Sequence, residues 1–216
     1  MKSEDRIIAF LDILGFKALI ECAEKANDYT KLSNLITKSN KIFSMLNARE
    51  DFQFTQFSDS FVLSCEIDRM EHSMLFIMDL RDLIDLFLSE NILLRGGVTI
   101  GKVIHSKKLL MGPAMNRAYE LESKFAKYPR VIIDMDLFDY WETCLYEYNV
   151  ENMFTVFKDD DGLYFIDYIN KGYLLPKFSL ILNKSNELLN SNIEGLVEKG
   201  TWLSEKLKKS KNFIQD

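Results

Sequence analysis

The sequence predicts an α+β sandwich in which a mostly antiparallel sheet is covered by helices on one side. Short apolar runs of β-prone residues end in turn signals, and they alternate with longer stretches of helical periodicity. No internal repeat or low-complexity linker interrupts the 216 residues. The expected order is a strand, two helices, two strands, a helix, two strands, a helix, a strand, a β-hairpin and a helical tail.

The first elements place polar residues where buried strands end. Residues 7–11 predict a buried strand that stops at Asp12, and Gly15 marks the turn that follows. The pattern over residues 16–47 is helical and is broken near Asn27, which predicts two helices.

Two strands with a tight turn between them come next. They span residues 52–56 and 61–63, so Asp59 is expected at the tip of the turn. The periodicity then predicts a long amphipathic helix at residues 70–89.

The rest of the chain adds a hairpin, a helix and a tail. Residues 93–104 predict a hairpin that turns at Gly101, and a helix begins near Pro113 and runs to about residue 127. The remaining elements are a strand at 130–133, a hairpin around 159–162 and a helical tail at 177–208, whose lysines from 206 to 211 are expected in solvent.

Composition limits the partners. The chain has 27 basic and 33 acidic residues, a net charge of −6, so its surface repels polyanions and long nucleic acid is not an expected partner. The three cysteines and two histidines lack the spacing of a disulfide framework or a zinc site, and buried free thiols are expected. The sequence predicts neither a signal peptide nor a membrane span, which favours a cytoplasmic location.

Asp12 and Asp59 are the candidate metal ligands. Each is typical of a turn or a helix cap when taken alone, but two carboxylates at neighbouring strand ends can share a pair of Mg²⁺ or Mn²⁺ ions. Because Asp12 follows a buried strand, where an unpaired charge is costly, a cationic group is expected near it.

Two glycine-containing segments suggest close approaches to the backbone. The turn from Ile13 to Phe16 leads into a helix, and its amides can bind a phosphate, although Gly15 also fits a plain strand-to-helix turn. Gly96 and Gly97 lie in mid-strand, which predicts either a bulge or a close approach to the backbone, by a ligand or equally by a helix.

Four segments, taken in order, resemble the motifs of class III nucleotidyl cyclases. They read FLDILGF at 10–16, FSDSFV at 57–62, RGGVTIG at 95–101 and GPAMNRAYELES at 112–123, and they span the first two thirds of the chain. The segments LDILGF, SDS, LRGG and AYELES more closely resemble the motifs of the pyrimidine cyclases of bacterial Pycsar anti-phage defence.

This resemblance implies a ferredoxin-like cyclase domain at residues 1–170 and a helical extension packed on it at 171–216. It implies a homodimer, with active sites at the subunit interface, that converts UTP or CTP into the 3′,5′-cyclic monophosphate and pyrophosphate. Asp12, Asp59 and the Ile13 carbonyl match the ligands of two Mn²⁺ or Mg²⁺ ions. Asn116 matches an asparagine that orients the ribose and the reacting phosphate from across the dimer.

The chain departs from the purine cyclases at the catalytic cation. Glu120 stands where those enzymes have a transition-state arginine, and a carboxylate cannot stabilise developing negative charge. Arg130, which begins a strand beyond the same helix, is expected to supply the cation, with Arg117, Lys124 and Lys158 as alternatives.

A second departure concerns the base. Thr55 and Leu109 occupy the positions at which purine cyclases read the base, and the lysine and acid that read adenine are missing. Thr55 can bond to a uracil or cytosine edge, while Phe52, Phe54 and Phe57 are either strand core residues or pocket walls that favour a single-ring base. We therefore expect UTP as the preferred substrate and CTP as the second, an order that rests on the family and on no residue.

Two other functions remain open at this point. Glu120 also fits a catalytically silent nucleotide-binding homologue that acts as a scaffold. Paired aspartates also occur in ferredoxin-like palms that join nucleotides, but the acidic composition lacks the basic channel such an enzyme needs.

Overall fold

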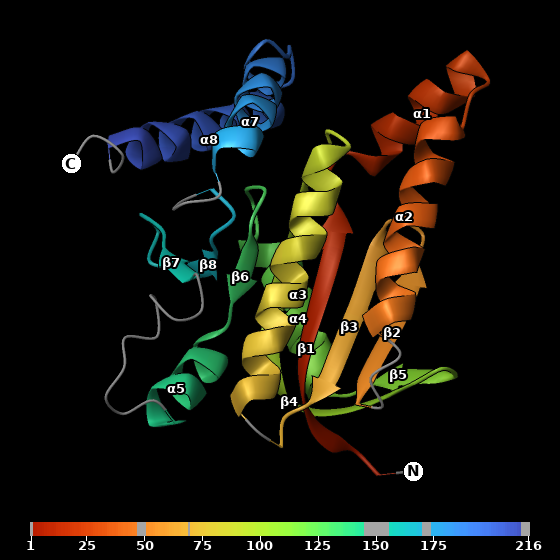
Figure 1. The fold of residues 1–216 in the computed structure, drawn as a ribbon, viewed down its shortest axis with the longest axis vertical. Helices are drawn as coiled ribbons and strands as arrows, with labels where there is room; N and C mark the ends of the chain where they lie inside the picture. The colour runs from red at the N-terminus through yellow and green to blue at the C-terminus, as the bar shows by residue number, and fades with distance from the viewer. Residues whose placement is uncertain (1, 47–50, 69, 145–155, 170–173, 213–216) are drawn as a thin grey trace.

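The computed structural model describes residues 2–46, 51–68, 70–144, 156–169 and 174–212. Its centre is an eight-stranded sheet in the order β2-β3-β1-β4-β6-β8-β7, with β5 paired to β4 (Figure 1). Among the strand pairs described, only β4 with β6 is parallel. The strands are β1 (Glu4–Ile13), β2 (Phe52–Phe57), β3 (Ser60–Glu66), β4 (Leu94–Ser106), β5 (Leu109–Met111), β6 (Val131–Ile133), β7 (Val156–Lys158) and β8 (Tyr164–Ile166).

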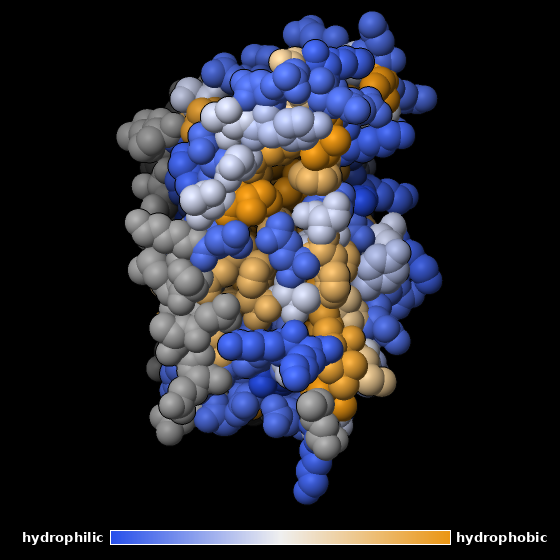
Figure 2. Space-filling view, turned by 90° about the vertical axis from the view of Figure 1, so that its right-hand side faces the viewer, coloured by the Kyte–Doolittle hydropathy of each residue, from blue (hydrophilic) through white to orange (hydrophobic). Residues whose placement is uncertain are grey.

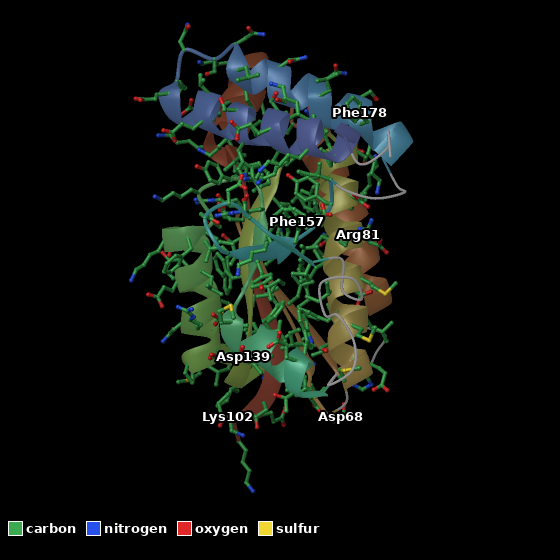
Figure 3. All side chains as sticks on the ribbon, turned by 90° about the vertical axis from the view of Figure 1, so that its left-hand side faces the viewer. Asp68, Arg81, Lys102, Asp139, Phe157 and Phe178 are labelled. Carbon is green, nitrogen blue, oxygen red and sulfur yellow. The ribbon has the colours of Figure 1, made fainter. Side chains whose placement is uncertain are left out.

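Helices lie on both faces of the sheet and across one end. Figure 3 shows α4 on one side of the strands and α3 on the other, with α7 and α8 across the end of the sheet. The helices are α1 (Phe16–Ala26), α2 (Thr30–Leu46), α3 (Met70–Ser89), α4 (Pro113–Glu120), α5 (Met135–Cys144), α7 (Leu174–Leu189) and α8 (Glu194–Asn212), and a π-helical turn, η1 (Leu121–Phe125), continues α4. The predicted α+β class with a mostly antiparallel sheet is confirmed, whereas helical cover on one side only is wrong.

The central strand β1 is buried on both faces, which explains its continuous apolar sequence. Alternate residues point to two separate apolar clusters: Ile7, Ala9 and Leu11 join the large cluster, while Ile8 and Phe10 join a smaller one with α4. The large cluster also contains residues of α7 and α8, among them Ile181, Leu188 and Leu203. The helical extension and the sheet therefore share one core.

A glycine allows α4 to approach the sheet. A Cβ atom placed on Gly97 would lie 2.8 Å from the Ala118 carbonyl oxygen, closer than real contacts allow. The close approach predicted for mid-strand glycines is confirmed at this position, and a helix makes it.

Several sequence-based expectations are wrong. Residues 94–106 form one long strand with Gly101 inside it, at φ +146°, and the turn lies beyond Ser106. The tail forms two helices, and the side chain of Lys206 is buried rather than in solvent. Helix α5 was not expected, and of the three cysteines only Cys65 is buried.

Within the described ranges, no helix combines the length and the apolar character needed to cross a bilayer.

Candidate active site

The end of β1 places Asp12 between two neighbouring strands. In the sheet register, Asp12 lies opposite Ser60 of β3 on one side and Arg95 of β4 on the other. Ile13, the last residue of the strand, donates its N–H to the Asp59 carbonyl oxygen at 3.1 Å. This backbone bond holds the Ser58–Asp59 turn against the end of β1, so the two predicted metal ligands are neighbours.

The turn that carries Asp59 has only two residues between β2 and β3. Ser58 has φ +51°, the left-handed conformation that tight hairpin turns require. Asp59 and Asp12 are both partly exposed, and the side chain of Asp12 is 16% exposed. Both carboxylates can therefore be reached from solvent.

Arg95 joins the partly buried carboxylate of Asp12 to the buried carboxylate of Glu122. Its Nε donates to Asp12 Oδ2 at 3.2 Å, and its Nη2 lies 2.7 Å from Glu122 Oε1 in an ion pair whose angles fall short of a hydrogen bond. Ser60 Oγ donates a further bond to Asp12 Oδ1 at 3.3 Å. The cation expected beside Asp12 is therefore Arg95, which sequence analysis singled out only for the glycines that follow it.

Burial makes the charged forms of both carboxylates unfavourable. Burial raises the pKa of Asp12, Arg95 opposes this effect, and the nearby Asp59 adds to it. Burial likewise raises the pKa of Glu122, again against Arg95, with smaller contributions from Asp12 and Asp59. The partly buried Asp12 and the buried Glu122 share one arginine, and the negative charge that remains can be neutralised by a cation.

The C-terminal helices bring another cation toward this cluster. Burial lowers the pKa of Lys199 on α8, and the charge of Arg95 lowers it further. Lys199 Nζ donates to the Gly195 carbonyl at 2.8 Å. Helix α8 therefore carries a lysine whose pKa is lowered by the charge of Arg95 in the site.

The donor set fits a hard divalent cation. Carboxylate and carbonyl oxygens are the ligands that Mg²⁺ and Mn²⁺ prefer, and Asp12, Asp59 and the Ile13 carbonyl supply them. The part of the chain that the structure describes gathers no group of three or more acidic, histidine or cysteine side chains that could hold a metal ion. Asp12 and Asp59 would therefore need a substrate or water to complete a coordination shell.

The turn after β1 has the geometry of a strand-to-helix junction. Gly15 has φ +77°, and the Leu14 N–H donates to the Leu93 carbonyl at 2.9 Å. The ring of Phe16 packs against the large apolar cluster. A substrate at this turn would therefore meet the backbone of Phe16 rather than its ring.

Asn116 is an exposed residue of α4. Figure 3 shows this helix on the face of the sheet opposite α3. The side chain of Asn116 has no hydrogen-bond partner among the described residues, and no described contact joins it to Asp12 or Asp59. Glu120, one turn later, pairs with Arg117 at 3.2 Å and with Lys124 at 2.9 Å. Arg117 also holds Asp134 at 2.7 Å, so two of the alternative cations are already paired.

Arg130 is not brought to Asp12. Its side chain is 1% exposed, pairs with Asp159 and Asp161, and lies over the ring of Tyr128 at 5.3 Å. Asp159 also accepts bonds from Lys206 and Trp202 of α8. A catalytic role for Arg130 stays a prediction, and it requires this buried network to open.

The predicted base-reading positions have different surroundings. Thr55 Oγ1 lies 2.8 Å from His105 Nε2, and Leu109 is 39% exposed on β5. Phe52 is buried and Phe54 stacks on Phe43 at 3.7 Å, so both are core residues and not pocket walls.

Phe57 keeps 51% of its surface exposed at the end of β2. Figure 2 looks onto the side of the molecule that holds α2 and β2 and shows a band of apolar surface between hydrophilic areas. Of the three phenylalanines, Phe57 alone is available for stacking on a base.

Sequence reasoning missed Arg95, Glu122 and His105. The register of β1 with β4 pairs Asp12 with Arg95, and such pairing becomes visible only when the strand order is known. Glu122 stands in the π-helical turn η1, whose departure from α-helical periodicity turns its side chain inward.

No protein-family model and no curated protein matches the sequence. Solved structures do match. A bacterial light-regulated adenylyl cyclase aligns with a TM-score of 0.54 and 16% identity over 85% of this chain and 100% of its own. The monomeric guanylyl cyclase domain of the RhoGC fusion protein from the aquatic fungus Blastocladiella emersonii aligns with a TM-score of 0.55 and 15% identity over 77% and 98%.

A third structure, the guanylate cyclase domain of RhGC from Catenaria anguillulae in complex with GTP, aligns with a TM-score of 0.52 and 16% identity over 77% of this chain and 98% of its own. At these identities the similarity concerns the fold. The chain therefore has the fold of the class III nucleotide cyclase catalytic domains, as the sequence motifs predict.

Proposed function

We propose that this chain is a nucleotide cyclase that converts a pyrimidine nucleoside triphosphate into its 3′,5′-cyclic monophosphate and pyrophosphate. The observation that carries the proposal is the placement of Asp12 beside the Asp59 turn, in a fold shared with adenylyl and guanylyl cyclases. In the reaction, the ribose 3′-oxygen bonds to the α-phosphorus, its proton leaves, and the bond to the pyrophosphate group breaks.

Different residues of the chain would bind the metal ions, the phosphates and the ribose. Asp12, Asp59 and the Ile13 carbonyl would hold two divalent cations, which when bound lower the pKa of the 3′-hydroxyl and neutralise the triphosphate. The backbone of the turn at Phe16 would bind phosphate, and Asn116 of a second copy would orient the ribose. Because Asn116 has no described contact with Asp12 or Asp59, a site shared between two copies fits the placement of these groups.

A pyrimidine substrate is supported by what stands at the base-reading positions. Thr55 and Leu109 offer neither the lysine nor the acid expected for adenine, and Phe57 is exposed and free to stack. We propose UTP as the preferred substrate and CTP as the second.

The activity is tested by pyrophosphate release from UTP with purified protein and Mn²⁺. The proposal expects release that requires the metal and that disappears in Asp59→Ala. The matched control is Asp139→Asn, a change of an exposed aspartate on α5 (Figure 3), which should leave release unchanged. Equal release by Asp59→Ala would contradict the assignment of the site.

A catalytically silent nucleotide-binding scaffold is the second candidate. It is favoured by Glu120, which pairs with Arg117 and Lys124 and stands where purine cyclases have a transition-state arginine. Tight binding of UTP in Mn²⁺ without any product would identify the silent protein.

The resemblance to Pycsar cyclases extends the proposal to anti-phage defence, with the cyclic nucleotide as a second messenger for a separate effector. In bacteria that express the chain, phage infection should raise the level of the cyclic nucleotide for the wild type and not for Asp12→Ala. Cyclic nucleotide levels that ignore infection would contradict this role while leaving the enzymatic proposal intact.

A further inference from the structure

A buried chain of hydrogen bonds ends on Thr55. Arg6 Nε donates to Ser64 Oγ at 2.9 Å, Ser64 Oγ lies 2.9 Å from His105 Nδ1, and His105 Nε2 lies 2.8 Å from Thr55 Oγ1. Arg6, Ser64 and His105 are buried, whereas Thr55 is partly exposed. We call these four residues the Thr55 relay.

The direction of the first bond follows from the chemistry of arginine. A guanidinium group is always protonated and only donates, so Ser64 Oγ is the acceptor for Arg6. The hydroxyl of Ser64 still has one hydrogen to donate. Over the ranges that the structure describes, its only other hydrogen-bond partner is His105 Nδ1, so Ser64 donates to that nitrogen.

The direction of the second bond follows from the first. A neutral imidazole carries one proton, and when Nδ1 accepts a bond the proton resides on Nε2. His105 Nε2 therefore donates to Thr55 Oγ1. Burial, and then the charge of Arg6, lower the pKa of His105 to about 4, which agrees with a neutral ring at physiological pH.

Thr55 is thereby left with a hydrogen to donate. Its oxygen accepts from His105, and its own hydroxyl hydrogen has no acceptor among the described residues. We propose that the Thr55 relay fixes Thr55 as a hydrogen-bond donor toward the nucleotide base and so selects a base with a carbonyl oxygen at the edge that Thr55 reads. The inference rests on the proposed function.

A fixed donor distinguishes the two pyrimidines. Uracil, like thymine, has a carbonyl oxygen at position 4, whereas cytosine has an amino group there, which also donates. Two donors facing each other leave both unpaired, and an unpaired buried donor is costly. The Thr55 relay therefore favours UTP over CTP, a preference for which the sequence alone offered no residue.

The first test measures the tautomer of His105 without any activity. The ¹⁵N spectrum of the imidazole rings of the labelled full-length chain reports which nitrogen carries the proton. The chain has two histidines, so His72→Gln assigns the signals. The proposal expects a protonated Nε2 and a bare Nδ1 at neutral pH, shifting in Ser64→Ala. A proton on Nδ1, or on both nitrogens, would overturn it.

The second test measures the ratio of kcat/KM for UTP to that for CTP. Thr55→Val should lower this ratio by about tenfold, the value of one hydrogen bond, and Thr55→Ser should preserve it. Thr143→Val, which removes an exposed hydroxyl on α5, is the matched control and should leave the ratio unchanged.

The outcomes separate this inference from the proposed function. An unchanged ratio in an active Thr55→Val would mean that Thr55 reads an atom common to both bases and would overturn the inference alone. If the wild type turns over no nucleotide, the proposed cyclase activity is wrong. The preference for UTP over CTP is then measured by calorimetry in Mn²⁺, as the ratio of the two binding affinities. Equal binding of the two nucleotides by the wild type would overturn the inference as well.

Discussion

Arg95 Nε donates a hydrogen bond to Asp12 Oδ2 over 3.2 Å, from the strand directly beside it. The same guanidinium pairs with Glu122, so one residue of β4 balances the buried carboxylate of Glu122 and the partly buried carboxylate of Asp12. A cation bound at Asp12 would reinforce this balance, because burial raises the pKa of both acids despite Arg95. In the metal-free chain, the charged forms of Asp12 and Glu122 are therefore unfavourable.

Asp12→Asn should abolish turnover and, at the same time, raise the melting temperature of the metal-free protein. A carboxyl whose pKa is raised by burial opposes folding when it is charged, so removing the charge stabilises the chain, by about 2–4 °C for each kcal/mol in a domain of this size. Calorimetric melting in EDTA checks the stability, and pyrophosphate release checks the activity. A lower melting temperature than in Asp139→Asn would contradict the electrostatic explanation.

Mn²⁺ should stabilise the wild type and leave Asp12→Asn almost unchanged. A ligand that binds only the folded state at a hundred times its Kd contributes about 2.7 kcal/mol, which corresponds to about 5–10 °C in the melting temperature. Melting curves over a Mn²⁺ titration provide the measurement. Identical shifts in the two proteins would show that the metal binds elsewhere.

Mixing Asp59→Ala with Asn116→Ala should restore activity to two inactive proteins. In a hybrid dimer with shared sites, one site keeps both intact residues, and random mixing restores about a quarter of the wild-type activity. Mass spectrometry shows whether hybrids form. Hybrids without activity would mean that Asp59 and Asn116 act within one subunit.

Asp159→Asn should lower the free energy of unfolding by about 3 kcal/mol, because it removes the shared partner of buried Arg130 and Lys206. Burial alone would raise the pKa of Asp159, but bonds from Lys206 and Trp202 outweigh it and lower the pKa below its ordinary 3.8. The stabilisation is therefore complete above pH 3.8 and is lost as the pH falls further. Urea titrations at several pH values should show a weaker acid dependence in the variant, and an unchanged dependence would contradict this role.

Much of the fold could be predicted because its signals are local. Helix α3 begins and ends at the residues that its periodicity indicates, and the strands around Asp59 follow from a polar turn between apolar runs. Gly101 misled the prediction because a glycine also marks a turn, yet here β4 continues through it with φ +146°. The break in the C-terminal tail lacks proline and glycine, and it is made by the turn-forming residues Asn190, Ser191 and Asn192, with the Ile193 N–H donating to Ser191 Oγ.

The sequence could predict only those residues of the candidate site whose role follows from a single segment of the chain. Asp12 and Asp59 stand at strand ends, and the pattern indicates this. The Thr55 relay draws on residues of four different strands, β1 to β4, and the partner of Asp12 comes from β4. Such groupings depend on strand order and register, and Lys206 is buried because α8 folds back onto β7 and β8.

The most direct measurement is a competition in which UTP, CTP, ATP and GTP are present at equal concentration with Mn²⁺ and the products are identified by mass. Cyclic UMP should be the dominant product, cyclic CMP should come second, and both should vanish in Asp12→Asn. Dominant cyclic AMP or cyclic GMP would contradict a pyrimidine cyclase, and a linear dinucleotide would contradict a cyclase altogether.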